Sequence, residues 1–541
     1  MGTLLTRARE HYSRKEYAPA RSICDEILNR KPTHRVALYL SALCAVHGDH
    51  YDEAVTSLSK LVTHYPDHVN GLLLLSKVHL RLGDHRQSVL YARKVLDLDV
   101  TDDRVLALLA DLFGKSEDHY SAKAAYERAI QLNPRNAAHW CNHASILRIE
   151  GRIEEAVKAL ERCIDLDAAY CKAHWMLSSL KRQTKSDNHI RRLRQVGVSR
   201  NVNKKGKMLI NFALSKEYED TGEYGKSFDC LLQACRLKRE SIRYDVERDT
   251  LPFRQLENLF DSEYVDRMAG SGYTNCAPIF IVGLPRTGST LIEQILGANG
   301  KLLAAGELPF FGNEVARMFH DHTGHTVDFS GVEAKDVDYR ELGRRYVEKS
   351  MAFIQSARHK AAFDSSDTFI DKMPRNFLYV GFILLALPSA KVIVTQRNAM
   401  DTCLSNLKQL YNDPFYQFSY RLDEMGAYLI AWHRLMQHWL RLFGTRILTV
   451  EYEEFVDRPD VNAERIFEYC GVPWDRKYLD YAAQERLVAT ASATQVREAI
   501  SKDSVNRWKH YEQSLQPLLS QLRHAGLVPQ GEGHSVKANR P

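Results

Sequence analysis

The feature that most restricts the fold of this chain is a 34-residue period in its first third. One position of the period has a small side chain each time, at Ala20, Ala54, Ser88, Ala122 and Ala156. A second position has Pro32, Pro66, Val100, Pro134 and Ala168. Small side chains let two helices cross closely, and Pro suits the turn before a following helix. Apolar faces at helical spacing fill the intervals, so the period predicts stacked helical pairs rather than an irregular bundle.

These five periods in register resemble the tetratricopeptide repeat. The resemblance implies that residues 1–184 form an α-helical repeat superhelix, which would bind a protein or peptide partner. The phase breaks near Arg182, and a polar, basic stretch continues to Lys207. Because no aromatic side chains are interleaved with these charges, a solvated connector is favoured over a nucleic-acid patch. A further helical pair follows, so residues 185–275 are predicted to be a connector that contains a degenerate repeat.

From residue 276 onward, short apolar runs alternate with longer helical patterns. The runs cover residues 279–282, 368–370, 391–394 and 447–450. This alternation predicts an α/β domain over 276–525, in which crossover helices join the strands of a parallel sheet. Ligands of such sheets bind beyond the carboxyl ends of the strands, so the residues after each run form the candidate site. Residues 526–541 are rich in Pro and Gly and are predicted to form a disordered tail.

The first run continues into Gly283-Leu284-Pro285-Arg286-Thr287-Gly288-Ser289-Thr290, where a helix is expected to begin. A helix start offers unpaired backbone N–H groups and a positive dipole end, so this turn predicts an anion cradle. The spacing Gly283-x4-Gly288 is that of a phosphate-binding P-loop. Ser289 stands where a P-loop has Lys, which argues against an ATPase, a GTPase or a kinase-like phosphotransferase. Arg286 offers a planar fork for a terminal phosphate or sulfonate instead.

This P-loop-like turn resembles that of the sulfotransferases whose donor is 3′-phosphoadenosine 5′-phosphosulfate (PAPS). The likeness is greatest to their protein-tyrosine and tetratricopeptide-repeat branches, and it extends over residues 278–519. It implies PAPS as the co-substrate, with no metal. It also implies that five consecutive residues bind the 5′-phosphosulfate: Arg286, Thr287, Gly288, Ser289 and Thr290.

Arg397 follows the third run, and Ser405 lies eight residues later, two turns into the next predicted helix. Two helical turns bring the hydroxyl back toward the end of the strand, so both side chains can face one phosphate. The spacing is similar to the family's site for the 3′-phosphate of PAPS. Arg397 could instead pair with Asp401, and the residues alone leave both interpretations open.

Two candidate catalytic residues follow the turn and the second run. An acceptor hydroxyl needs a base within hydrogen-bond reach, and Glu307 matches the family's Gly-Glu motif, where Glu is that base. A lone Glu is also typical of a solvated helix cap. Lys372 is similar to the family's Lys that stabilises the bridging oxygen of the leaving phosphate. The alternative for Lys372 is a pair with Asp371 on a surface turn.

Three further residues enter by resemblance alone. Ser492 matches the Ser beside the sulfonate, and Arg507 matches the family's Lys or Arg on the 3′-phosphate side. Tyr452 matches a Tyr at the nucleotide. The catalytic candidates are therefore Glu307, Lys372, Ser492 and Arg286, while Arg397, Ser405, Tyr452 and Arg507 join the turn in binding the nucleotide.

The composition and charge of the chain restrict its class of ligand and its cellular location. The net charge of +6 over 541 residues suits a small polyanion but does not indicate a nucleic-acid binder. No apolar segment is long enough to cross a membrane, and no signal-peptide segment precedes the first charges. The 10 Cys occur singly, which is typical of reduced thiols in a cytoplasmic protein. The group His320-Asp321-His322 with His325 is more typical of a solvated loop than of a metal site.

The sequence therefore predicts a PAPS-dependent sulfotransferase that acts on a hydroxyl, with protein tyrosine favoured as the acceptor. A carbohydrate, lipid or small-molecule hydroxyl is an open alternative, because the same base would serve it. So is a non-catalytic repeat scaffold with a vestigial nucleotide site. The oligomeric state stays open.

Overall fold

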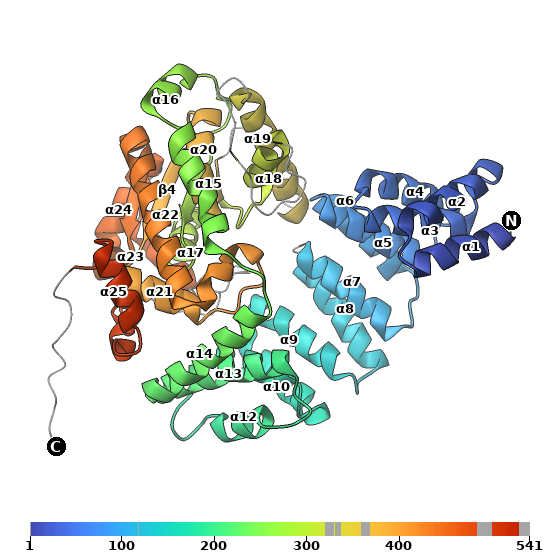
Figure 1. Ribbon diagram of the computed structural model, residues 1–541, viewed down its shortest axis with the longest axis horizontal. Coiled ribbons are helices and arrows are strands. Elements are labelled where there is room, and N and C mark those ends of the chain that lie inside the picture. Colours follow the sequence, from blue (N-terminus) through green and yellow to red (C-terminus); the bar gives the residue numbers. More distant parts are fainter. Residues whose placement is uncertain are drawn as a thin grey trace. The chain divides into compact units, whose positions relative to one another are not determined.

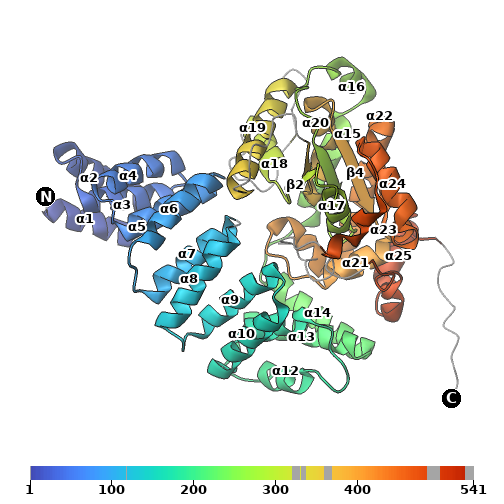
Figure 2. The same ribbon diagram turned by 180° about the vertical axis from the view of Figure 1, so that it is seen from behind.

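The computed structural model describes residues 2–116, 118–319, 329, 337–358, 368–483 and 500–529. The chain divides into two compact units (Figures 1 and 2). The first consists of residues 1–168 with 352–361, and the second of residues 169–351 with 362–541. The predicted tail after residue 529 lies outside the described residues.

The first unit is a run of paired helices, blue to cyan in Figure 1. Its helices are α1 (Gly2–Ser13), α2 (Tyr17–Arg30), α3 (Arg35–His47), α4 (Tyr51–His64), α5 (Val69–Arg81), α6 (His85–Asp97), α7 (Asp103–Lys115), α8 (His119–Leu132), α9 (Ala137–Glu150) and α10 (Ile153–Leu166). The Pro positions of the period fall in the turn before the next pair. The predicted stack of helical pairs is confirmed.

The small residue of each period occupies the same place, the fourth residue of the second helix of its pair. All of them, from Ala20 in α2 to Ala156 in α10, are fully buried. Ser88 differs from the Ala positions because its hydroxyl needs a partner, and the Ser76 hydroxyl bonds to it at 3.1 Å. A side chain larger than these would force the paired helices apart.

The second unit begins with helices that precede the sheet. These are α11 (Cys171–Leu180), α12 (Ile190–Gly197), α13 (Lys204–Asp220), α14 (Tyr224–Glu240), α15 (Val246–Leu259) and α16 (Ser262–Met268). The pair α13–α14 retains the geometry of the repeats: Ser227 is the fourth residue of α14, is fully buried, and donates to Ser215 O at 2.7 Å. The connector thus contains a helical pair of repeat type.

A five-stranded parallel sheet forms the centre of the second unit, in the order β2-β3-β1-β4-β5. Its strands are β1 (Ile279–Gly283), β2 (Leu303–Ala304), β3 (Phe369–Asp371), β4 (Lys391–Gln396) and β5 (Ile447–Glu451). The elements around it are α17 (Ser289–Gly297), α18 (Phe310–Met318), α19 (Tyr339–Arg358), η2 (Pro374–Tyr379), α20 (Val380–Ala386), α21 (Ala399–Leu407), η3 (Pro414–Tyr420), α22 (Leu422–Phe443), η4 (Gly444–Arg446), α23 (Tyr452–Asp457), α24 (Pro459–Cys470), η5 (Arg476–Ala483), η7 (Arg507–Tyr511) and α25 (Gln516–His524). The predicted architecture, helical repeats followed by an α/β domain with a parallel sheet, is confirmed.

Both faces of the central strand β1 are buried, as its unbroken apolar sequence requires. Alternate side chains point to opposite faces. Ile279 and Ile281 join a cluster with side chains of α17 and α24, whereas the ring of Phe280 packs against Phe311 of α18 and Tyr346 of α19. Helices therefore cover both faces of the sheet, and its carboxyl edge is where a ligand would bind.

Among the described residues, no helix is both long and apolar enough to cross a membrane. In the same part of the chain no group of three or more His, Cys, Asp or Glu side chains could hold a metal ion. The group from His320 to His325 lies outside the described residues. The ten Cys all lie within them, and none forms a disulfide.

Candidate active site

The turn of residues 283–290, called here the phosphate loop, joins β1 to α17. Gly283 has a φ of 146°, Arg286 of 72° and Gly288 of 95°, so three residues of the turn have a positive φ before α17 begins. A Cβ on Gly288 would lie 2.8 Å from the ring of Tyr452, which only Gly avoids. The amino end of α17 then offers backbone N–H groups beyond the sheet, as expected for an anion cradle.

The helix after β4 holds the phosphate loop in place. Arg286 Nε donates to Ser405 Oγ at 3.1 Å, and Asn406 Nδ2 donates to Pro285 O at 3.0 Å. Arg397 Nη1 donates to Arg286 O at 3.2 Å. The structure thus brings Arg286, Arg397 and Ser405 together at one edge of the sheet. The hydroxyl of Ser405, expected to share a phosphate with Arg397, accepts a hydrogen bond from Arg286.

Arg397 is nearly buried, with 8% of its side chain exposed, and it lies over the ring of Tyr452 at 4.9 Å from the centroid. Its Nη2 donates to Ser504 O. Its Nε has no hydrogen-bond partner among the described residues, and Glu453 Oε1 is 4.0 Å away. The alternative pairing of Arg397 is not observed there, because the carboxylate of Asp401 accepts from two backbone N–H groups instead.

Those two N–H groups belong to Asn506, at 2.7 Å, and Trp508, at 3.0 Å. Arg507 lies between them, so the loop that carries it is fixed to the first turn of α21. Arg507 is 41% exposed, and its Nη1 lies 3.7 Å from Glu219 Oε1. Ser492 lies outside the described residues.

On the other side of β1, Lys372 and Glu307 form an ion pair at the ends of β3 and β2. Lys372 is 1% exposed and Glu307 is 43% exposed. Glu293 of α17 is the second carboxylate, 4.0 Å from Lys372 Nζ, and it also accepts from Gly306 N at 3.1 Å. Burial alone would lower the pKa of Lys372, but the two carboxylates outweigh it and raise that pKa above its ordinary value.

Lys372 does not pair with its neighbour in the chain on a surface turn. The Asp371 carboxylate is buried and accepts from Tyr346 Oη at 2.8 Å, Asn376 Nδ2 at 3.2 Å and Leu308 N at 3.3 Å. Burial raises the pKa of Asp371 to about 7, although these donors act to lower it. Asp371 therefore fixes the ends of β2 and β3 relative to each other, while Lys372 is left for Glu307.

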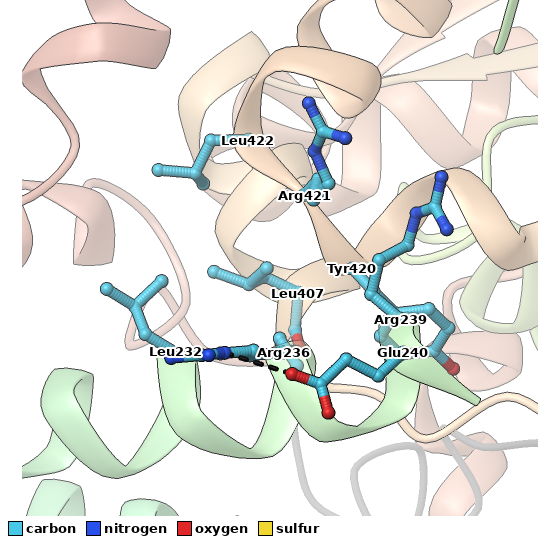
Figure 3. Close-up of a pocket in the computed structure, with 9 residues that line it drawn as sticks. Leu232, Arg236, Arg239, Glu240, Leu407, Tyr420, Arg421 and Leu422 are labelled. Atoms are coloured by element: carbon cyan, nitrogen blue, oxygen red, sulfur yellow. Dashed lines mark hydrogen bonds and ion pairs between the residues drawn. The ribbon is translucent and has the colours of Figure 1, made fainter. Parts of the chain in front are cut away.

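A separate pocket of about 570 Å³ lies between α14 and the segment from Leu407 to Leu422 (Figure 3). It is lined by apolar side chains, among them Leu232, Leu407 and Leu422, and by the charged Arg236, Arg239, Arg421 and Glu240. Arg236 pairs with Glu240 at 3.1 Å. None of the residues predicted for the site lines this pocket, so the candidate site is the carboxyl edge of the sheet.

The fold and the site together define a class: a helical-repeat protein whose second unit carries a P-loop-like turn beside an ion pair between a buried lysine and a partly exposed glutamate. A profile of the sulfotransferase family matches residues 278–476, and tetratricopeptide-repeat profiles match residues 36–68 and 108–170. The chain therefore carries tetratricopeptide repeats followed by a sulfotransferase-family domain, as the sequence predicted.

Individual proteins match parts of the chain. An uncharacterized protein of Aquifex aeolicus is 31% identical over 70% of this chain, and the match spans 49% of that protein, about half its length. Protein-tyrosine sulfotransferase A of Caenorhabditis elegans is 21% identical over 50% of this chain and 70% of its own. Among solved structures, YrrB, a TPR protein with an unusual peptide-binding site, aligns over 31% of this chain and 88% of its own at 17% identity and a TM-score of 0.29.

Sequence reasoning missed several residues that build the site. Glu293 is one, and a signal for it existed, because a carboxylate interrupts the apolar stretch from Leu291 to Leu296. Asp401 was considered only as a partner of Arg397. Its bonds to residues more than a hundred positions away left no trace in the local sequence.

We expect Lys372→Met to lower the free energy of unfolding of the second unit by about 3–5 kcal/mol, because it leaves the buried Glu293 carboxylate without its cation. Glu307→Gln leaves Lys372 with the Glu293 carboxylate and keeps an acceptor oxygen beside it, so it should cost less, about 1–2 kcal/mol. Urea unfolding followed by tryptophan fluorescence would compare the two variants. Equal losses would show that Lys372 is not held by a buried charge pair.

Proposed function

We propose that this protein is a sulfotransferase that uses PAPS and transfers its sulfuryl group to a hydroxyl, tyrosine of a protein or peptide being the favoured acceptor. The observation that supports this most is the convergence at one sheet edge of two arginines beside the phosphate loop and a buried lysine paired with an exposed carboxylate. The first set suits a donor with phosphate groups. The second suits proton removal and charge stabilisation.

The residues fit a nucleotide with separate anionic groups. The amino end of α17 and the Arg286 fork suit the 5′-phosphosulfate. Arg397, with a buried Nε that lacks a partner among the described residues, suits a 3′-phosphate together with Arg507. Burial and the nearby Arg397 lower the pKa of Arg286, as expected where two cations are brought together without bulk solvent. An anion bound there would relieve this repulsion.

In the proposed reaction, Glu307 accepts the proton of the acceptor hydroxyl as its oxygen attacks sulfur. The bond from sulfur to the 5′-phosphate oxygen breaks, and the products are a sulfate ester and 3′,5′-ADP. Glu307 Oε1 is held by Lys372, and among the described residues Oε2 has no hydrogen-bond partner. Lys372 holds Glu307 in position and places a fixed cation where negative charge grows on the leaving phosphate.

Two considerations favour tyrosine as the acceptor. The tyrosine branch has Glu as its base, and Glu307 lies in the equivalent motif, beside the lysine that such a mechanism needs. The helical repeats are also a type of surface that binds extended peptides, which would supply the partner or the acceptor.

The thiols of this chain, none of them in a disulfide, fit a cytoplasmic protein.

The nucleotide assignment predicts that 3′,5′-ADP binds without a metal and more tightly than AMP or ATP. Arg397→Ala should weaken the binding of 3′,5′-ADP by about 2–3 kcal/mol, since a charged hydrogen bond to phosphate is lost. Isothermal titration calorimetry measures both. Arg421→Ala, in the lining of the separate pocket, is the matched control and should leave the affinity unchanged. If the wild-type protein binds AMP as tightly as 3′,5′-ADP, the assignment of Arg397 is wrong.

The acceptor assignment predicts that ³⁵S from labelled PAPS enters protein when the enzyme is incubated with a cell lysate. Label that survives alkaline hydrolysis and co-migrates with tyrosine sulfate would identify the residue. Label found only in the small-molecule fraction would overturn tyrosine and leave the sulfotransferase assignment in place.

With the labelled acceptor in hand, Glu307→Gln is expected to lower turnover by roughly 10²–10⁴-fold, the usual contribution of a general base. Affinity for 3′,5′-ADP should stay as in the wild type, because the change lies away from the phosphate loop. Glu464→Gln, on the exposed surface of α24, controls for loss of a charge. Turnover near the wild-type rate in the Glu307→Gln variant would mean that Glu307 only positions Lys372.

A further inference from the structure

One face of α21 connects three segments that are far apart in the sequence. Asp401, Ser405 and Lys408 follow one another at spacings of four and three residues, so they lie on the same side of this helix and its carboxyl end. Asp401 binds the backbone around Arg507, and Ser405 binds Arg286. Lys408, the third of these residues, contacts α13.

The partner of Lys408 is Glu219, which lies before the segment that the sulfotransferase profile covers. Lys408 Nζ donates to Glu219 Oε1 at 2.8 Å, and Arg507 Nη1 lies 3.7 Å from the same oxygen. Glu219 is 10% exposed. Burial opposes its ionisation, but the charges of Lys408 and Arg507 outweigh burial and lower the pKa of Glu219 below its ordinary value. One carboxylate thus holds two cations of the sulfotransferase domain.

The helices around Glu219 are firmly attached to that domain. The ring of Tyr224 stacks on His510 at 4.3 Å, and Ser227 Oγ lies 3.2 Å from Tyr511 Oη, both partners being in η7. At the other end of α14, Arg239 binds the Glu424 carboxylate through two nitrogens, at 2.8 and 2.9 Å. The position of Glu219 is therefore set by packing, unlike that of a surface ion pair.

We propose that Glu219 positions Arg507 for the 3′-phosphate of the nucleotide, so that a helix of repeat type completes the nucleotide site. This inference rests on the proposed function, in which Arg507 contacts that phosphate. The Arg507 side chain is long and 41% exposed, so without a partner it would sample many rotamers. The ion pair with Glu219, 3.7 Å from Nη1, restricts the guanidinium, so that nucleotide binding has less side-chain freedom to remove.

The test compares two ligands that differ only in the 3′-phosphate, 3′,5′-ADP and AMP, by calorimetry on the full chain. Glu219→Ala is expected to weaken the binding of 3′,5′-ADP by up to about tenfold, the scale of ordering one flexible side chain, and to leave the affinity for AMP within about twofold. Glu219→Gln keeps an acceptor oxygen at the same length and should lose less. A merely structural role would weaken both ligands alike and would overturn the proposal, as would tighter binding of 3′,5′-ADP to the Ala variant.

Glu217 is the matched control, because it is a buried carboxylate on the same helix. Its oxygens bind Ser178 Oγ and His189 N, both at 2.6 Å and both before α13. Glu217→Ala should leave the ratio of the two affinities unchanged at temperatures where the variant is folded. If Glu219→Ala does not fold, the test uses Arg507→Ala and the double variant Arg507→Ala/Glu219→Gln. In the background of Arg507→Ala, Glu219→Gln should not change the ratio of the two affinities any further.

The same measurements separate this proposal from the proposed function. A wild-type protein that binds AMP and 3′,5′-ADP equally would contradict the nucleotide assignment itself. A wild-type protein that prefers 3′,5′-ADP, with the same preference in Glu219→Ala and Glu219→Gln, would contradict only the role of Glu219.

Discussion

The close approach of β1 and β4 where both strands end is the constraint on which the site depends. Gly283 pairs with Thr395 in the parallel register, and a Cβ on Gly283 would lie 2.5 Å from Thr395 O. The hydroxyls of Thr287 and Thr395 then meet at 2.7 Å. Because the backbones come this close, the phosphate loop leaves β1 directly beside the strand that leads to Arg397. A bulkier residue at 283 would separate the phosphate loop from the strand that leads to Arg397.

Charge is distributed unequally on the two sides of β1. On the β4 side, Arg286 donates to the Ser405 hydroxyl and Arg397 donates to backbone carbonyls, with the Glu453 carboxylate 4.0 Å from Arg397 Nε. On the β3 side, Lys372 is buried between two carboxylates. A buried ion pair contributes little net stability but makes the removal of one partner costly. In the proposed function the first arrangement would bind the anionic donor, and the second would hold the base and a cation beside it.

The pair α13–α14 has two roles in this fold. Its Ser215 and Ser227 meet as Ser76 and Ser88 do in the repeats, so its local geometry is that of a repeat. Yet Glu219 and Tyr224 face the sulfotransferase domain, while Glu217 faces the preceding helices. Two residues that are two positions apart on a helix, such as Glu217 and Glu219, point to nearly opposite sides. One helix can therefore pack against the preceding repeat-type helices on one side and against the sulfotransferase domain on the other.

The sequence by itself determined the features that depend on local spacing. The 34-residue period located the helical pairs, the apolar runs located four of the five strands but not the two-residue β2, and the phosphate loop followed from its Gly spacing after β1. It also identified Arg397, Glu307 and Lys372 as candidates, but it left open the pairs Arg397–Asp401 and Lys372–Asp371. Only the tertiary structure decided these, because Asp401 and Asp371 find buried partners that lie up to 107 positions away or on another helix. Such choices depend on which polar groups folding buries together, since a buried carboxylate must find donors wherever the packing supplies them, and adjacent residues in the sequence carry no record of that.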